Sequence, residues 1–222
     1  MLSKETIVKL TKNARAIVYV IAFFLAILTW FVYADKGNIS VTMSNAFGYL
    51  SFSFISLALI VSPIRTLWPT FSLNPAIFMA RRAIGICAFF FALFHYIIQL
   101  FLNFGGDVNL VFFYALGPGG FGLLLGPISL TIMFLLFITS FDFAVQKLGK
   151  KWYTLHKLIY LAYPLIIYHA YSIGLDFQNT GPNAYSVSFF VIAIATMLLE
   201  LARAYKVMTK PRAPLQQQAE NK

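Results

Sequence analysis

Charged residues are scarce in this 222-residue chain, and acidic residues are the scarcest of them. Only 11% of the residues are charged, with 7 Asp or Glu against 17 Lys or Arg, whereas soluble domains carry about 25% charged residues. Hydrophobic residues make up 60% of the chain and aromatic residues 18%. A soluble core of this size cannot bury so much apolar side chain, so the composition predicts a membrane protein.

Cysteine and histidine are also rare. Cys87 is the single cysteine, so no disulfide can form within the chain. The three histidines are His95, His156 and His169, and each stands in an apolar run. No cluster of cysteines or carboxylates accompanies them, which argues against a zinc site with three or four protein ligands.

Six apolar stretches of about 20 residues are each long enough to cross a hydrocarbon core of about 30 Å as a helix. The sequence therefore predicts an all-α bundle of six transmembrane helices over residues 14–205. Residues 1–13 precede this single membrane domain, and residues 206–222 follow it as a tail. Pro127 and Pro164 are expected to bend the fourth and fifth spans. The expected spans are residues 14–33, 46–63, 83–103, 123–143, 152–173 and 186–205.

The basic residues mark one side of the expected bundle. They gather before the first span, between the second and third, between the fourth and fifth, and after the sixth. The other three loops contain Lys36 as their only cation. By the positive-inside rule, both termini are expected in the cytoplasm. The charge thus orients the protein, and its distribution gives no sign of a nucleic-acid surface.

The depths of the histidines can be compared, because the third and fifth spans both run outward from the cytoplasm. Counted from the basic residues that open each span, His95 lies 13 residues in, which is about 20 Å. His156 and His169 lie 5 and 18 residues in, about 7 and 27 Å. His95 therefore matches His169 better than His156. On a straight helix the last two point about 140° apart, so they face different neighbours unless a kink at Pro164 brings them together.

Paired imidazoles on facing helices are the arrangement that a bis-histidine haem requires. A lone histidine in a membrane helix is as often a hydrogen-bonded structural residue. A haem-free transporter or structural membrane protein is therefore the alternative of another class. Purified protein with a b-type haem spectrum would favour the haem protein, and a colourless preparation would favour the alternative.

Two runs of sequence carry a resemblance to a known family. The run RRAIGICAFFFALFHY, residues 81–96, resembles the third helix of the bacterial MsrQ (YedZ) family. The run SFDFAVQKLGKKWYTLHKLIYLAYPLIIYHAY, residues 140–171, resembles its fourth-to-fifth-helix segment, with K-L-G-K-x-W-x-x-L-H and a second histidine 13 residues later. That family belongs to the wider ferric-reductase-like transmembrane group, which includes NADPH oxidases.

The resemblance implies an electron-transfer subunit of an oxidoreductase system rather than a stand-alone enzyme. It implies haem b in the bacterial inner membrane and a periplasmic molybdopterin-containing methionine-sulfoxide reductase subunit as the acceptor. The implied donor is a cytoplasmic flavin reductase or a membrane quinol, and FMN is associated with the family. Because no flavin and nicotinamide module follows the sixth span, the donor is expected to be another molecule. The alternative is a ferric or other metal reductase with the same haem relay.

The resemblance also implies particular site residues. Members of the wider group often carry two histidines on each of two helices and hold two haems. Here Arg81 stands 14 residues before His95, where the first histidine is expected, so one complete site remains, with His95 and His169 as axial ligands. For His156 the alternatives are a second haem with another ligand, a hydrogen bond to a propionate, or a flavin or quinone site. Arg81 and Arg82 are expected either to pair with haem propionates or to anchor the topology.

The expected topology can be tested with a reporter enzyme that is active only in the periplasm. Fused after Lys222, the reporter should be inactive, because the charge pattern places this end in the cytoplasm. Fused after Gly106, in the loop expected outside, it should be active. Periplasmic activity of the C-terminal fusion would contradict six spans.

Overall fold

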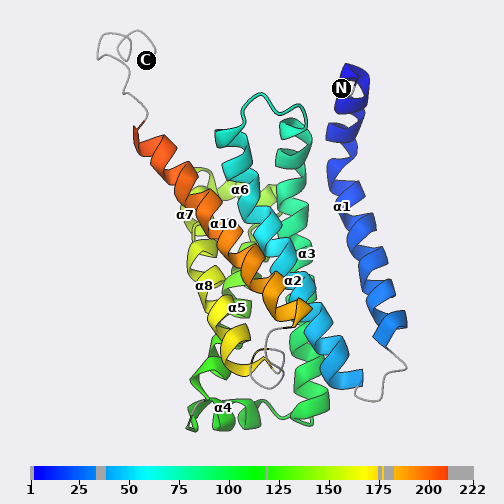
Figure 1. Ribbon diagram of the computed structural model, residues 1–222, viewed down its shortest axis with the longest axis vertical. Coiled ribbons are helices and arrows are strands. Elements are labelled where there is room, and N and C mark those ends of the chain that lie inside the picture. Colours follow the sequence, from blue (N-terminus) through cyan, green and yellow to red (C-terminus); the bar gives the residue numbers. More distant parts are fainter. Residues whose placement is uncertain (1–2, 34–38, 119, 175–176, 178–182, 210–222) are drawn as a thin grey trace.

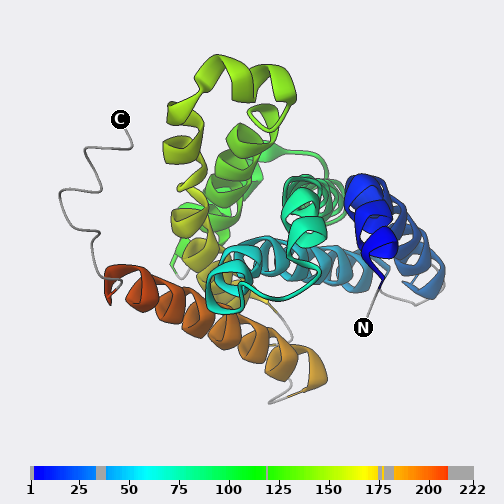
Figure 2. The ribbon, with the colours of Figure 1, turned by 90° about the horizontal axis from the view of Figure 1, so that it is seen from above.

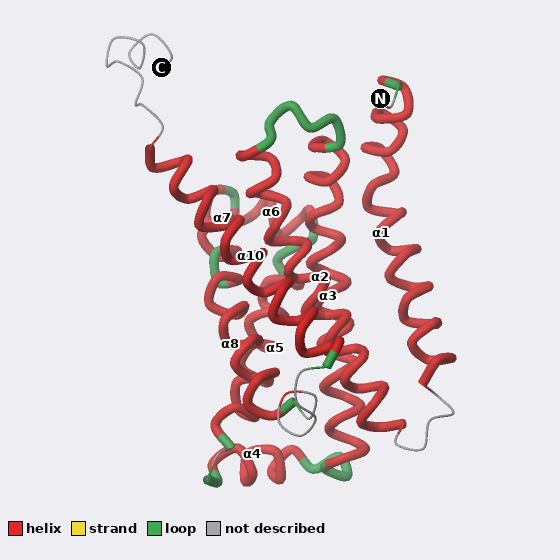
Figure 3. The backbone as a smooth tube through the Cα atoms, in the orientation of Figure 1, coloured by secondary structure: helices red, strands yellow, loops and turns green. Residues whose placement is uncertain are grey.

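A computed structural model describes residues 3–33, 39–118, 120–174, 177 and 183–209, and the regular structure in these residues is helical throughout (Figure 3). The all-α expectation is therefore confirmed. Lys36 and the tail from residue 210 onward lie outside the described residues. The helices are α1 (Lys4–Tyr33), α2 (Ile39–Leu67), α3 (Asn74–Asn103), α4 (Val108–Leu116), α5 (Phe121–Ile138), α6 (Asp142–Leu148), α7 (Lys150–His156), α8 (Ile159–Ile173) and α10 (Ala184–Thr209).

Among the described residues, five helices are long and apolar enough to cross a membrane, namely α1, α2, α3, α5 and α10. Each contains most of an expected span, and the chain is a multi-pass membrane protein. Several helices extend beyond the expected bounds. The third begins at Asn74 instead of residue 83, with Pro75 in its first turn, where a missing N–H costs nothing.

The expected fifth span, residues 152–173, is divided into α7 and α8. At the division, the N–H groups of Lys157 and Leu158 bond the carbonyls three residues back, at 3.2 and 3.0 Å. These tighter bonds interrupt the α-helical pattern. Pro164 lies six residues further on and stays inside α8. With 15 residues, α8 is about 22 Å long, shorter than a hydrocarbon core of about 30 Å, so it does not qualify as a span by itself.

The helices form a bundle in which α2 and α3 pack together along their length (Figures 1 and 2). α5 pairs with α8, α10 packs on α2, and α1 lies at the edge against α3. The start of α1 and the end of α10 lie at the same end of the bundle (Figure 1). The short helix α4 lies across the opposite end (Figure 1).

Aromatic rings and small residues build the interior. Phe52 stacks on Phe189, with ring centroids 3.9 Å apart, and on Tyr163 at 5.7 Å. Ala88 and Ala162 are completely buried, with 0% exposure. Small side chains let helix backbones approach closely in a membrane, where packing replaces the hydrophobic effect as the force between helices. The stacked rings thus tie α2 to both α8 and α10.

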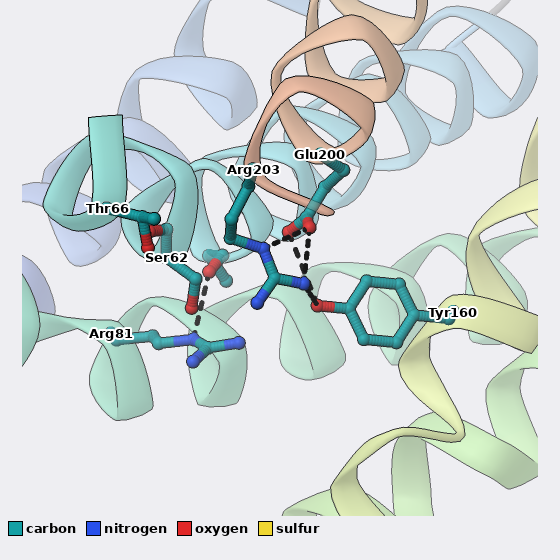
Figure 4. Close-up of polar contacts among 7 residues, drawn as sticks. Ser62, Thr66, Arg81, Tyr160, Glu200 and Arg203 are labelled. Carbon is teal, nitrogen blue, oxygen red and sulfur yellow. Dashed lines mark hydrogen bonds and ion pairs between the residues drawn. The ribbon is translucent and has the colours of Figure 1, made fainter. Parts of the chain in front are cut away.

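A polar cluster joins α10 and α8 (Figure 4). Arg203 lies 2.7 Å from the carboxylate of Glu200, and its guanidinium donates to the Tyr160 hydroxyl at 3.0 Å. Arg81 points toward the same region and donates to the Ala58 carbonyl at 3.1 Å (Figure 4). Ionisable groups in membrane helices are costly unless they are paired, so the contacts among α10 and α8 satisfy charges that the lipid would not.

A second set of charges connects α1, α3 and the start of α6. Arg82 donates to the Asp142 carboxylate, and Arg15 lies 4.0 Å from it. The hydrogen bond from Arg82, followed by its positive charge, lowers the pKa of Asp142 from its ordinary value. The Asp142 side chain is 69% exposed, so water screens the attraction and these contacts orient helices more than they stabilise them.

The packing of α10 can be tested with one buried and one exposed alanine on the same helix. Ala193 is 3% exposed in the core, whereas Ala195 is exposed. Ala193→Leu should lower the free energy of unfolding by about 1–3 kcal/mol through overpacking. Ala195→Leu is the matched control and should stay within about 0.5 kcal/mol of the unsubstituted protein. Denaturant titration in detergent micelles measures both, and equal effects would contradict this packing.

Candidate functional site

A cavity of about 930 Å³ lies among α2, α3, α4, α5, α8 and α10, toward the end that α4 covers. Its volume falls in the range of about 300–1,000 Å³ that is usual for cofactor and ligand pockets. None of the described residues that line it is Asp, Glu, Lys or Arg. Apart from two histidines, its polar lining consists of amides and hydroxyls, including Asn45, Tyr96, Gln99, Asn103 and Tyr114. The wall is therefore polar in places but uncharged.

Two of the three histidines line this cavity. His95 comes from α3 and His169 from α8, and their ring centroids lie 6.3 Å apart with the ring planes at 88°. Metal–imidazole bonds of about 2 Å, with about 1 Å from each nitrogen to its ring centre, separate two rings on one metal by about 6 Å. The two imidazoles thus have the spacing of a pair that shares one metal atom.

Each imidazole binds a backbone carbonyl through Nδ1. Nδ1 of His95 lies 2.8 Å from the Ser44 carbonyl oxygen, and Nδ1 of His169 lies 2.8 Å from that of Gly122. The Ser44 hydroxyl also lies 3.0 Å from Nδ1 of His95. A carbonyl only accepts, so Nδ1 carries the proton in both rings and Nε2 keeps its lone pair. Histidines that bind metals usually hold their other nitrogen in this way.

Two glycines leave the space that the rings occupy. A Cβ on Gly126 would lie 2.6 Å from Cε1 of His169, a distance that real Cβ atoms do not show. A Cβ on Gly48 would lie 3.1 Å from Nδ1 of His95. Gly126 comes from α5 and Gly48 from α2. The rings can approach these helices because neither position has a side chain.

A buried hydroxyl in the cavity wall lacks a partner. Ser129 is 2% exposed, and its oxygen makes no hydrogen bond with the described part of the chain. Buried polar groups are normally satisfied, so an orphaned hydroxyl facing a cavity is consistent with a bound molecule.

These features fit a flat metal cofactor that brings its own equatorial ligands. Two Nε2 atoms, a glycine-lined space and an uncharged cavity meet the needs of a haem with two axial histidines. Within the described ranges, no group of three or more His, Cys, Asp or Glu could hold a metal ion, so a zinc site with three or four protein ligands does not match.

His156 lies away from this cavity. Its Nε2 is 3.2 Å from the Thr139 hydroxyl, and its ring stacks on Trp152 with centroids 4.0 Å apart. Trp152 in turn donates to the Thr139 carbonyl at 2.9 Å. Of the two arrangements that the sequence left open, the structure has the one in which His156 and His169 face different neighbours.

The structure does not bring Arg81 and Arg82 to the cavity either. Arg81 contacts the Ala58 carbonyl and Arg82 contacts Asp142, both toward the other end of the bundle.

Sequence reasoning missed the two carbonyl acceptors and the two glycines. The signal that was available is their spacing, since Ser44 and Gly48, like Gly122 and Gly126, are four residues apart and share a helix face.

Comparisons with known proteins identify the family of the chain. The profile of the family described as ferric reductase like transmembrane component matches residues 47–167. A Brucella anthropi protein named protein-methionine-sulfoxide reductase heme-binding subunit MsrQ is 27% identical over 200 residues, covering 88% of this chain and 87% of the relative. Proteins of the same name from Brucella ovis and Brucella suis are 29% identical over 170 residues, covering 77% of this chain and 72% of each relative.

Proposed function

The chain belongs to the ferric-reductase-like transmembrane family, and we propose that it is a haem b electron-transfer subunit of the bacterial inner membrane. The observation that carries the proposal is the imidazole pair of His95 and His169, with ring centroids 6.3 Å apart in an uncharged cavity. The haem-binding name of the relatives supports the same cofactor.

Haem, when bound, supplies an iron centre that accepts and donates single electrons. His95 and His169 would hold it through Nε2 from opposite sides, and the carbonyls of Ser44 and Gly122 keep both nitrogens aimed at the cavity. With His95 and His169 both holding the iron, no protein-free position would be left on it for a substrate. The arrangement therefore suits electron transfer better than chemistry on a bound substrate.

We also propose six crossings with both termini cytoplasmic, in which α7 and α8 together form the fifth. Basic residues support this orientation, because they gather where α1 begins, α2 ends, α7 begins and α10 ends. Lys206 near the end of α10 donates to the Leu67 carbonyl at the end of α2, at 3.4 Å, which brings two of these segments together. In this orientation the cavity lies in the outer half of the membrane.

The name of the relatives supports a methionine-sulfoxide reductase as the partner. The finer proposal is a periplasmic, molybdopterin-containing catalytic subunit as acceptor, and a cytoplasmic flavin reductase or membrane quinol as donor. On the donor side, we include FMN as a candidate cofactor of this system. A second cofactor site is placed at His156, near Arg81 and Arg82. The family description favours one further candidate, a ferric or other metal reductase, which differs only in the acceptor.

The ligand assignment predicts the spectra of three alanine variants. His95→Ala and His169→Ala each remove one of two axial ligands and should lower low-spin haem per protein by at least about tenfold, since weaker outer contacts already cost 10- to 100-fold in metal proteins. His156→Ala is the matched control and should keep the low-spin b-type spectrum. The assignment fails if His169→Ala keeps the full spectrum while His156→Ala loses it.

The direction of electron flow can be tested in membrane vesicles of known orientation. A flavin reductase or a quinol added on the cytoplasmic side should reduce the haem, and the methionine-sulfoxide reductase subunit on the other side should reoxidise it. Ferric iron replaces that acceptor in a parallel assay and separates the two candidate functions. Failure of every donor to reduce haem that is present would refute the relay role.

A further inference from the structure

The same contact pattern occurs twice around the cavity. In α2 the carbonyl of Ser44 accepts the Nδ1–H of His95, and Gly48 lies against the same ring. In α5 the carbonyl of Gly122 accepts the Nδ1–H of His169, and Gly126 lies against that ring. In both helices the acceptor and the glycine are four residues apart, which is about one turn. Each imidazole is thus held at its edge by a carbonyl and on one side by a bare backbone.

These contacts restrict rotation of each ring about the axis through its Nε2. Turning the His95 ring would lengthen the 2.8 Å bond to Ser44, and turning the His169 ring would lengthen the 2.8 Å bond to Gly122. A carbonyl oxygen has two lone pairs, so it can accept the imidazole N–H and a helical N–H together. The helices α2 and α5 therefore fix the orientation of rings that α3 and α8 carry.

We propose that Gly48 and Gly126, with the carbonyls of Ser44 and Gly122, are positioning elements that hold the two axial imidazole planes at right angles. The inference rests on the proposed haem site and adds its electronic consequence. The observed angle between the ring planes is 88°. Neither the family profile nor the names of the relatives specifies this angle.

The angle between axial imidazoles has a spectroscopic consequence. Parallel planes overlap the same d orbital of low-spin ferric iron and split its two π-type d orbitals, which gives a rhombic paramagnetic resonance spectrum with three resolved features. Perpendicular planes overlap one orbital each, so the orbitals stay nearly equal in energy. The spectrum then shows one strong feature at large g, with the other two broadened. Ring orientation can therefore be read separately from haem content.

The first test is the spectrum of the ferric full-length protein in detergent, with haem measured per protein by pyridine haemochrome. A single large-g low-spin feature supports the proposal. A three-line rhombic spectrum at full haem content overturns it and leaves the proposed haem site standing. A protein that binds no haem under haem-replete expression overturns the proposed function itself.

The glycines are tested by alanine substitution. Gly126→Ala should shift the large-g feature toward a three-line or high-spin spectrum, because its Cβ would lie 2.6 Å from Cε1 of His169 and 3.0 Å from both ring nitrogens. Gly48→Ala should produce a smaller shift in the same direction, since its closest contact would be 3.1 Å. Gly85→Ala on α3 is the control, because a Cβ there meets nothing within 4 Å. Its spectrum should equal that of the unsubstituted protein.

Unchanged spectra in both Gly48→Ala and Gly126→Ala, with haem retained, would overturn the positioning role. If Gly126→Ala fails to accumulate, Gly48→Ala carries the test, since its neighbour needs to give by only a few tenths of an ångström. A shift in Gly85→Ala as large as those in Gly48→Ala and Gly126→Ala would also contradict the proposal. A general effect of adding a methyl group to a helix would then explain all three spectra.

Discussion

Each imidazole in the cavity gives its single N–H to a helix carbonyl, and the arrangement around the cavity depends on these two bonds. A neutral imidazole has one donor and one acceptor nitrogen, and an unsatisfied donor is costly in lipid. Using Nδ1 for the carbonyl leaves Nε2 for a metal. The bond also requires α2 to lie close to His95 and α5 to lie close to His169. A Cβ at Gly126 would prevent that approach and one at Gly48 would crowd it, so the hydrogen bonds and the glycines are parts of one constraint.

Among the residues that the structure describes, the wall of that cavity contains no Asp, Glu, Lys or Arg. Arg203, Glu200 and Tyr160 satisfy one another toward the end where α1 begins, and Arg82 pairs with Asp142. Phe52 and Phe189, whose rings stack on each other, line the cavity. Fixed charges close to a metal centre change its electrostatic potential strongly in a low-dielectric interior. For the proposed haem, an uncharged wall would leave that potential to the two imidazoles and to the carbonyls that they bond.

The sequence predicted what depends on composition and on distance along a helix. Apolar runs predicted the helices, and counting residues matched His95 with His169 in depth, which are the two rings that share the cavity. Their role as ligands stays a prediction. The division at Lys157 and Leu158 was not foreseen, because Pro164 was the visible breaker and it lies inside α8. The acceptors at Ser44 and Gly122 were also missed, because a backbone carbonyl leaves no mark on residue type.

The division of the fifth segment separates two kinds of histidine environment. His156 ends α7 and is held by Thr139 and Trp152, whereas His169 lies near the end of α8 and is held by a carbonyl. A side-chain hydroxyl can rotate, but a carbonyl inside a helix is fixed by the bonds of that helix. For the proposed electron transfer a fixed ligand is the better one, because groups that are oriented in advance need little reorganisation when charge changes. The pair held by two helix carbonyls is therefore the more suitable place for the proposed haem, whose charge would alternate during electron transfer.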